Sequence, residues 1–268
     1  VQAIGPGVTE YQPGDPVYYR ANRGMRLKSG GAVSCVSGTH CSHAVTAVGG
    51  THGIDHLPAE APPDAASMFV LPAVGLNGVD MAQPRLGDRV VVFGAGLIGL
   101  GVVAACVHRG CRVVAADIDP ARLQLARRFG AAHVVDTRET DLAGWLDSTF
   151  GGRADVVFEC TGLPDCIDPA ITLCREHGCF VWQGNYGSDP VNLHFLTPHA
   201  LRLRMCFPCD DGGPDCRRAV VRNMALGNLD WGRCISHRLP FPEAPALFHE
   251  LNEGRAREAT GIVINWEN

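Results

Sequence analysis

The chain has 268 residues, of which 46% are hydrophobic and 19% charged, and its formal net charge is −5. This length suffices for two domains or for one large domain with a buried core. The negative charge offers no basic surface to a phosphate backbone, which argues against nucleic acid as a partner. Because the sequence shows no signal peptide or lipidation motif, we expect a cytoplasmic protein without a membrane partner.

Twelve cysteines are scattered over the chain, and several fall in segments predicted to be buried. We expect reduced thiols that pack as small hydrophobic residues. Cys206 and Cys209 have the CxxC spacing of redox and zinc sites, but no second pair accompanies them, and we interpret them as an ordinary strand end.

The N-terminal segment is predicted to be a small β-rich module. Turn signals such as residues 5–7 separate short apolar pieces such as residues 16–19. A further strand is predicted to begin within residues 38–45 and to end at residues 49–50. The sequence begins without methionine, at a strand already under way, and we expect that its N-terminal part is missing.

Residues 57–83 are predicted to form a connector helix, because their apolar residues keep helical spacing. Pro72 lies inside this segment and is expected to allow a kink.

Residues 90–117 carry the most specific pattern. Four β-preferring residues precede Gly94-Ala95-Gly96-Leu97-Ile98-Gly99, and a helix-length apolar run and a second strand ending in Asp117 follow. In this setting the three glycines are a dinucleotide-binding fingerprint: the first permits a tight turn, the second lets the backbone approach a pyrophosphate, and the third lets the helix pack closely. The diphosphate is expected at the helix N-terminus. The candidate contacts are therefore Gly94, Gly96, Leu97, Ile98 and Gly99.

Asp117 is expected to accept hydrogen bonds from the adenosine ribose, and its charge would repel a 2′-phosphate. The pattern therefore predicts NAD(H) rather than NADP(H). A membrane span is the alternative for residues 90–107, which carry no charge and just reach the usual length. Four glycines between residues 94 and 101, and the lack of a second such segment, argue against it.

After Asp117, Asp119 and Pro120 are the predicted N-cap and first residue of a helix that ends at Gly130. Strands and helices then alternate, which predicts a doubly wound parallel sheet with its binding crevice at the carboxyl ends of the strands. The expected strands are residues 90–93, 112–117, 133–136, 155–159, 179–183 and 204–207. The further expected helices are residues 141–150, 164–177 closed by Gly178, and 198–203. Residues 211–268 are expected to hold helices at 215–226 and 243–251 and strands at 234–237 and 261–266.

With these segments in place, the chain resembles the medium-chain dehydrogenase/reductase superfamily, which includes zinc-type alcohol and polyol dehydrogenases and zinc-free relatives. The resemblance covers nearly the whole chain and rests on residues 8–17, 86–99, 155–162 and 235–244. It implies an α/β fold in which a Rossmann domain at residues 76–208 is joined to a partial, β-rich GroES-like catalytic domain. Residues 1–75 and the returning residues 209–268 would form the catalytic domain.

By position, the resemblance also implies cofactor contacts. Arg122 would lie near the adenosine, Cys160 and Thr161 at the adenine edge, and Gln183 and Gly184 near the nicotinamide. From the residues alone, the two strand ends at Glu159 and Gln183 are equally compatible with ordinary turns.

The family's zinc ligands are matched poorly. Members with a structural zinc carry four closely spaced cysteines where this chain has only Cys35. Most ligands of the catalytic zinc would lie upstream of Val1, and the remaining position falls at about Val70 or Leu71, neither of which binds zinc. The resemblance therefore favours a zinc-free member, with no metal ligand assigned; ligands upstream of Val1 would reopen the question.

His40 is the candidate for proton transfer, because the resemblance implies that the residues around it line the substrate pocket. His43 is second, and an ordinary role for both histidines is the alternative. A histidine suits this chemistry since its unperturbed pKa is about 6.5. His40, Cys41 and His43 also have the residue types of a metal cluster, but strand alternation would put positions 40 and 43 on opposite faces.

We therefore predict an NAD(H)-dependent oxidoreductase that moves a hydride between a small secondary alcohol or ketone and nicotinamide at a cleft between two lobes. An NADPH-dependent reductase of activated double bonds is an alternative, and so is a nucleotide-binding protein without catalysis. A homo-oligomer, a dimer or tetramer, is expected through the edge strand at residues 204–207.

Overall fold

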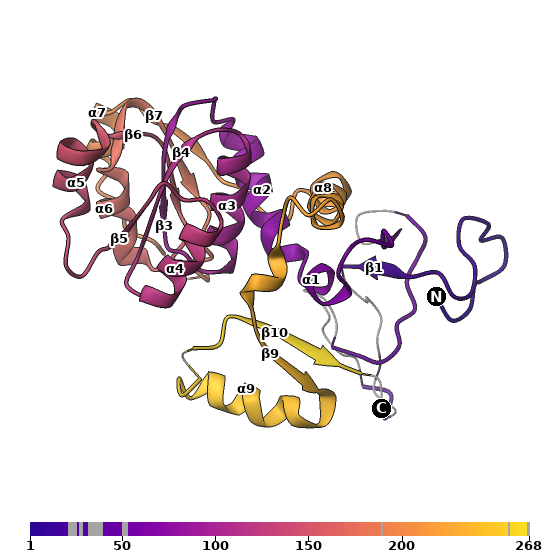
Figure 1. Ribbon diagram of the computed structural model, residues 1–268. Helices are drawn as coiled ribbons and strands as arrows, with labels where there is room; N and C mark the ends of the chain where they lie inside the picture. Colours follow the sequence, from indigo (N-terminus) through magenta and orange to yellow (C-terminus); the bar gives the residue numbers. More distant parts are fainter. Residues whose placement is uncertain are drawn as a thin grey trace. The chain divides into compact units, whose positions relative to one another are not determined.

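The computed structural model describes residues 1–20, 26, 29–31, 40–49, 53–188, 190–256 and 258–266. The chain forms two compact units, one of Val1–Val70 with Gly213–Asn268 and one of Leu71–Gly212 (Figure 1). Within the described ranges, no helix is both long enough and apolar enough to cross a bilayer.

The second unit contains a six-stranded sheet in the order β5-β4-β3-β6-β7-β8, and every neighbouring pair is parallel. The predicted doubly wound sheet is therefore confirmed. The chain order reverses between β3 and β6, so the loops that follow these two strands leave the sheet in opposite directions, and the binding crevice is expected at their carboxyl ends. The strands are β3 (Arg89–Phe93), β4 (Arg112–Asp117), β5 (His133–Asp136), β6 (Ala154–Glu159), β7 (Cys174–Trp182) and β8 (Arg204–Cys206).

Helices cover both faces of this sheet, with α2 and α3 on one side and α5 and α6 on the other (Figure 1). The sheet is buried because its strands are nearly continuous apolar runs, as parallel strands between two helical layers require. The helices are α2 (Val70–Ala82), α3 (Leu97–His108), α4 (Pro120–Arg128), α5 (Leu142–Trp145), α6 (Ile167–Ile171) and α7 (Leu196–Ala200); a π-helical turn (Leu146–Phe150) extends α5, and a 3-10 turn (Pro164–Cys166) precedes α6.

The helix predicted at residues 164–177 is too long. It ends at Ile171, and β7 has already begun at Cys174 because Cys174 pairs with Ala154 at a register shift. Gly178 is not a helix cap but lies inside the strand, where a Cβ would come within 2.9 Å of the Arg175 carbonyl oxygen. Gly178 therefore serves close backbone packing.

The connector helix is divided in two, α1 (Pro63–Ser67) and α2, but not at Pro72. The break falls at residues 68–69, so Pro72 lies in the first turn of α2, where its missing N–H has no intrahelical acceptor to lose. Glycines let α2 and α3 meet backbone to backbone: a Cβ on Gly75 would lie 2.8 Å from the Val102 nitrogen, and one on Gly101 would lie 2.8 Å from the Pro72 Cα.

The first unit combines two small sheets with helices. Strands β1 (Val17–Tyr19) and β2 (Ile54–His56) pair antiparallel, and β9 (Ile235–Pro240) and β10 (Gly261–Asn265) pair parallel. The core includes Trp231, which is fully buried, and Tyr18, whose ring meets Phe69 edge to face at 5.0 Å. The helices are α1, α8 (Gly213–Ala225) and α9 (Ala244–Asn252), with 3-10 turns at Trp231–Cys234 and Phe241–Glu243.

The strand predicted from residue 38 onward is wrong for its described part, since residues 40–49 are in no strand. Residues 38 and 39 lie outside the described residues. The GroES-like identity of this unit, with its boundaries at residues 75 and 209, remains a prediction.

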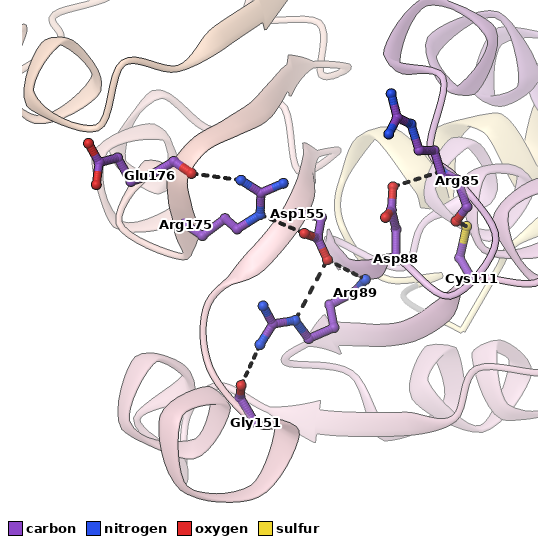
Figure 2. A network of polar contacts seen from close by, with 8 residues as sticks. All are labelled: Arg85, Asp88, Arg89, Cys111, Gly151, Asp155, Arg175 and Glu176. Carbon is purple, nitrogen blue, oxygen red and sulfur yellow. Dashed lines mark hydrogen bonds and ion pairs between the residues drawn. The ribbon is translucent and has the colours of Figure 1, made fainter.

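At the end of the sheet opposite the crevice, one carboxylate joins three segments (Figure 2). Asp155, at the start of β6, accepts from the Arg89 backbone N–H at 2.8 Å and from Arg175 Nε at 2.6 Å, and Arg89 Nε lies 3.6 Å away. The Arg89 side chain also donates to the Gly151 carbonyl. Burial favours the neutral acid, but the two arginines outweigh it and lower the pKa of Asp155.

Candidate cofactor-binding site

The glycine turn between β3 and α3 is built as tightly as its sequence suggests. Gly94 has φ of 99°, in the left-handed region, and its N–H donates to the Ala116 carbonyl at 2.8 Å. A Cβ on Gly99 would lie 2.0 Å from the Gly94 carbonyl oxygen, so any side chain there would push α3 off the turn. These two glycines are required by the fold itself.

Gly96 differs from both. Its φ of −68° and ψ of −177° are open to any residue, and a Cβ there would meet nothing within 4 Å. Gly96 is also the N-cap of α3, without a side-chain cap hydrogen bond, ahead of the first-turn N–H groups of Leu97 and Ile98. Such N–H groups, together with the helix dipole, attract an anion. The space in front of Gly96 is therefore the candidate position for a diphosphate.

Asp117 lies at the end of β4, beside this turn, and is 8% exposed. Its carboxylate accepts from the backbone N–H groups of Ala95 at 2.6 Å, Ile118 at 2.7 Å and Asp119 at 2.9 Å. A carboxylate has about four lone-pair sites, so a further acceptor site remains. Asp117 thus holds the turn in shape, and its contact with a ribose stays a prediction.

Arg122 is in the first turn of α4, where the Asp119 N-cap accepts from the backbone N–H groups of Ala121 and Arg122. The guanidinium of Arg122 forms an ion pair with Asp119, with Nε 3.6 Å from the carboxylate, and both side chains are more than one-third exposed. The contact of Arg122 with adenosine stays a prediction.

Cys160 and Thr161 directly follow β6 and touch the glycine turn. A Cβ on Gly94 would lie 2.9 Å from the Thr161 nitrogen, and one on Gly99 would lie 3.4 Å from the Cys160 Cβ. Burial, with the charge of Glu159 adding to it, raises the pKa of the Cys160 thiol. This thiol is therefore a neutral packing group at the crevice.

Gln183 and Gly184 follow β7, the neighbouring strand. The Gln183 side chain does not face the crevice: it is 4% exposed, Nε2 donates to the Val74 carbonyl at 3.1 Å, and a Cβ on Gly78 would lie 1.8 Å from Oε1. Any contact of Gln183 with a nicotinamide would have to come from its backbone.

Glu159 also lies in this region, and it is not among the site residues predicted from the sequence. It is completely buried, and its carboxylate accepts from the Thr161 backbone N–H at 2.9 Å, from the Thr161 hydroxyl and from the Tyr186 hydroxyl. In the sequence, the indication of its role is that this charged residue ends the otherwise apolar run at residues 156–159.

The candidate for proton transfer, His40, lies in the other unit. It is exposed, and its ring meets Phe248 of α9 with the centroids 5.8 Å apart. His43 is exposed and lies 3.1 Å from the Ser42 hydroxyl. The strand geometry used to separate these histidines is absent, since residues 40–49 are in no strand.

Zinc ligands are not brought together in the part of the chain that the structure describes: no group of three or more His, Cys, Asp and Glu residues there is arranged to hold a metal ion. Cys35 lies outside the described residues, and Val70 and Leu71 are apolar residues of α2.

Comparison with known proteins agrees with the fold. The family model of zinc-binding dehydrogenases matches residues 98–225. Sorbitol dehydrogenase 1 of Saccharomyces cerevisiae is 32% identical over 203 residues, which are 72% of this chain and 55% of that protein. The chain belongs to the zinc-binding dehydrogenase family. The chain spans about half the length of the curated relatives it matches.

Solved structures share the dehydrogenase fold at low identity. A zinc-binding dehydrogenase from Sinorhizobium meliloti 1021, solved with NADP, is 21% identical with a TM-score of 0.80, covering 98% of this chain and 80% of its own. An alcohol dehydrogenase from Escherichia coli CFT073, solved with NADH, is 19% identical with a TM-score of 0.79, covering 99% and 81%. These likenesses confirm the predicted fold class.

Proposed function

We propose that this dehydrogenase chain binds NAD(H) on the Gly94–Gly99 turn and belongs to an enzyme that moves a hydride between a secondary alcohol and a ketone. The observation that carries the proposal is the open space at Gly96. The fold needs Gly94 and Gly99 for its own packing, but it does not need a glycine at 96, where a Cβ would meet no other part of the protein within 4 Å. A diphosphate lying against the first turn of α3 accounts for that glycine.

Asp117 supports NAD(H) over NADP(H). Its carboxylate ends β4 next to the turn, and a 2′-phosphate would bring two negative charges together where water is largely excluded. Affinities for NADH and NADPH, compared by fluorescence titration, test this part. We expect NADH to bind at least about tenfold more tightly, which corresponds to about 1.4 kcal/mol.

For the reaction, the nicotinamide exchanges the hydride, and a protein group must handle the alcohol proton. We propose His40 for that proton and a zinc-free mechanism. A polyol or its ketose is the substrate class to test first, since the 32% identical relative is a sorbitol dehydrogenase. A homo-oligomer joined through β8, an edge strand of the six-stranded sheet, is proposed as its form.

A matched pair of glycine variants tests the nucleotide site. Gly96→Val fills the space expected for the diphosphate, whereas Gly5→Val adds the same bulk at another glycine with nothing within 4 Å and no positive φ. We expect both variants to fold, and only Gly96→Val to lose NADH binding, by at least about tenfold. Normal NADH binding by Gly96→Val would refute the site.

Turnover separates the proposal from its two alternatives. Oxidation of sorbitol, xylitol or simple secondary alcohols with NAD supports the dehydrogenase. NADPH-dependent reduction of an activated double bond would support a reductase instead. Tight NADH binding without turnover of either panel would favour a nucleotide-binding protein that has no catalysis.

A further inference from the structure

Glu159 is a completely buried carboxylate at the crevice edge of the sheet, and the function proposed above does not use it. Burying a carboxyl group costs free energy unless hydrogen bonds compensate. The burial of Glu159 therefore indicates a specific structural role. We infer that Glu159 is a positioning residue, which holds the loops after β6 and β7 in the arrangement that binds the dinucleotide. This inference rests on the proposed function.

The two carboxylate oxygens serve different loops. Oε1 accepts from the backbone N–H of Thr161, at 2.9 Å, and from the Thr161 hydroxyl, so it holds the loop after β6. Oε2 accepts from the Tyr186 hydroxyl and holds the loop after β7. The Glu159 main chain also binds the loop after β7, since its carbonyl oxygen accepts from the N–H groups of Gln183 at 3.0 Å and Gly184 at 2.8 Å. Glu159 thus joins the loop that directly follows it to a loop whose Tyr186 lies 27 positions further along the chain.

The loops fit each other without free space around this carboxylate. A Cβ on Gly184 would lie 2.6 Å from the Gly162 nitrogen and 2.9 Å from Glu159 Oε2. Gly162 has φ of 70°, and a Cβ there would lie 2.9 Å from the Asn185 carbonyl oxygen. Because main-chain atoms of the two loops are in contact, a shift of either loop would displace the other.

The loop after β6 in turn contacts the candidate phosphate site. The Thr161 nitrogen that donates to Glu159 is the atom that a Cβ on Gly94 would meet at 2.9 Å, and Cys160 lies against Gly99. A continuous set of contacts therefore runs from Glu159 through Thr161 to the turn that bears Gly96. Glu159 itself would touch no cofactor atom and acts through these neighbours.

The chemistry of the cluster requires an acceptor at both oxygens. One backbone N–H and two hydroxyl groups donate to the Glu159 side chain. An ionised carboxylate is the group that can accept at both of its oxygens. Burial, and then the hydrogen bond to Glu159, raise the pKa of Tyr186, so its phenol keeps the proton that it donates. In Glu159→Gln, one oxygen becomes an NH₂ donor and faces another donor, while the size of the side chain is unchanged. One of the two loops then loses its bond.

Asp155 provides the matched control, because it is a hydrogen-bonded carboxylate on the same strand but at the opposite end (Figure 2). Asp155→Asn is expected to lower stability without reaching the crevice. The experiment uses the full chain with Glu159→Gln, Tyr186→Phe, the double variant and Asp155→Asn. Two quantities are measured: amide hydrogen exchange in residues 160–163 and 184–187, and the Kd for NADH.

We expect Glu159→Gln to speed exchange in both loops and to weaken NADH binding about tenfold, whereas Asp155→Asn speeds exchange only near its own end of the sheet and leaves the Kd within about twofold. Tyr186→Phe should weaken binding less than Glu159→Gln. The double variant should be weaker than wild type by less than the product of the two single effects, since both changes break one shared bond.

Three results would overturn the inference: exchange in both loops as in wild type, faster exchange with an unchanged Kd, or a loss of affinity in Asp155→Asn equal to that in Glu159→Gln. Failure of the proposed function gives a different pattern. Wild-type protein would then bind no NADH, and the inference could not concern the cofactor. The exchange measurements need no cofactor, so they would still decide whether Glu159 holds the two loops.

Discussion

Asp155→Asn tests the electrostatic argument at the start of β6. The wild-type carboxylate, 17% exposed, accepts two hydrogen bonds from Arg89 and Arg175, and both arginines carry charge. Asparagine keeps one oxygen for one of these donors and turns an NH₂ group toward the other. One charge-assisted hydrogen bond is therefore lost, and the remaining one becomes weaker.

A hydrogen bond to a charged group contributes about 1.5–3 kcal/mol. The Arg175 side chain is 43% exposed, so water replaces part of what is lost. We expect the variant to lose about 1.5 kcal/mol in the free energy of unfolding, or about 3–6 °C in Tm.

The loss should depend on pH in a definite direction. The pKa of Asp155 is lowered in the folded state, while in the unfolded chain it is about 3.9. Its stabilising effect is therefore fully present above about pH 4 and is lost as pH falls through the folded-state pKa. Wild type and variant should differ at pH 7, and the difference should narrow as pH falls below about 4.

Urea unfolding at a series of pH values measures this difference. Asp147→Asn is the control, since it breaks an exposed ion pair with Arg153 at 3.0 Å and should cost less than about 1 kcal/mol. A gap between wild type and Asp155→Asn that stays constant from pH 7 to pH 2 would refute the assigned role of the charge. So would equal losses in the two variants.

Three further changes have definite expectations. Gly99→Ala places a Cβ 2.0 Å from the Gly94 carbonyl oxygen and should cost about 1–3 kcal/mol; an unchanged Tm would contradict the close packing. Asp119→Ala removes the N-cap of α4 and should cost about 1 kcal/mol by urea unfolding, and no loss would mean that the cap bonds contribute nothing. Burial, with Asp55 adding to it, raises the pKa of Tyr18 to about 12, so the stability that its neutral phenol contributes below pH 10 should be lost as pH rises from about 10 to 12. Tyr18→Phe should remove one phenol from the ultraviolet titration near pH 12; if that step persists, the assignment is wrong.

Local patterns were sufficient for most of the unit that holds the six-stranded sheet. The strand, glycine turn and helix at residues 89–108 follow from adjacent residues: β-branched side chains favour the strand, Gly94 permits the turn, and an uninterrupted apolar run continues as α3. The N-cap at Asp119 is equally local, since its carboxylate reaches only to Ala121 and Arg122. Features formed within a few residues are visible in a single sequence.

Features that depend on distant partners were missed. Residues 174–177 look helical because Ile171 and Cys174 keep helical spacing, but pairing with β6 makes them a strand. The Gln183 amide follows a strand end like a ligand contact, yet Val74, which is 109 positions away, holds it on α2. The hydrogen bond between Tyr186 and Glu159 spans 27 positions, and no local sequence pattern predicts it.

The contact between Gly75 and Gly101 has a consequence for how this protein tolerates sequence change. Where side chains separate two helices, a larger residue on one is commonly accommodated by a smaller residue on the other. Here a Cβ at either position would meet main-chain atoms, at 2.8 Å in each case. Main-chain atoms are present in every residue, so no substitution on the facing helix can remove them. Random mutagenesis should therefore recover almost no substitutions at these two positions, and no second mutation elsewhere should restore those that are lost.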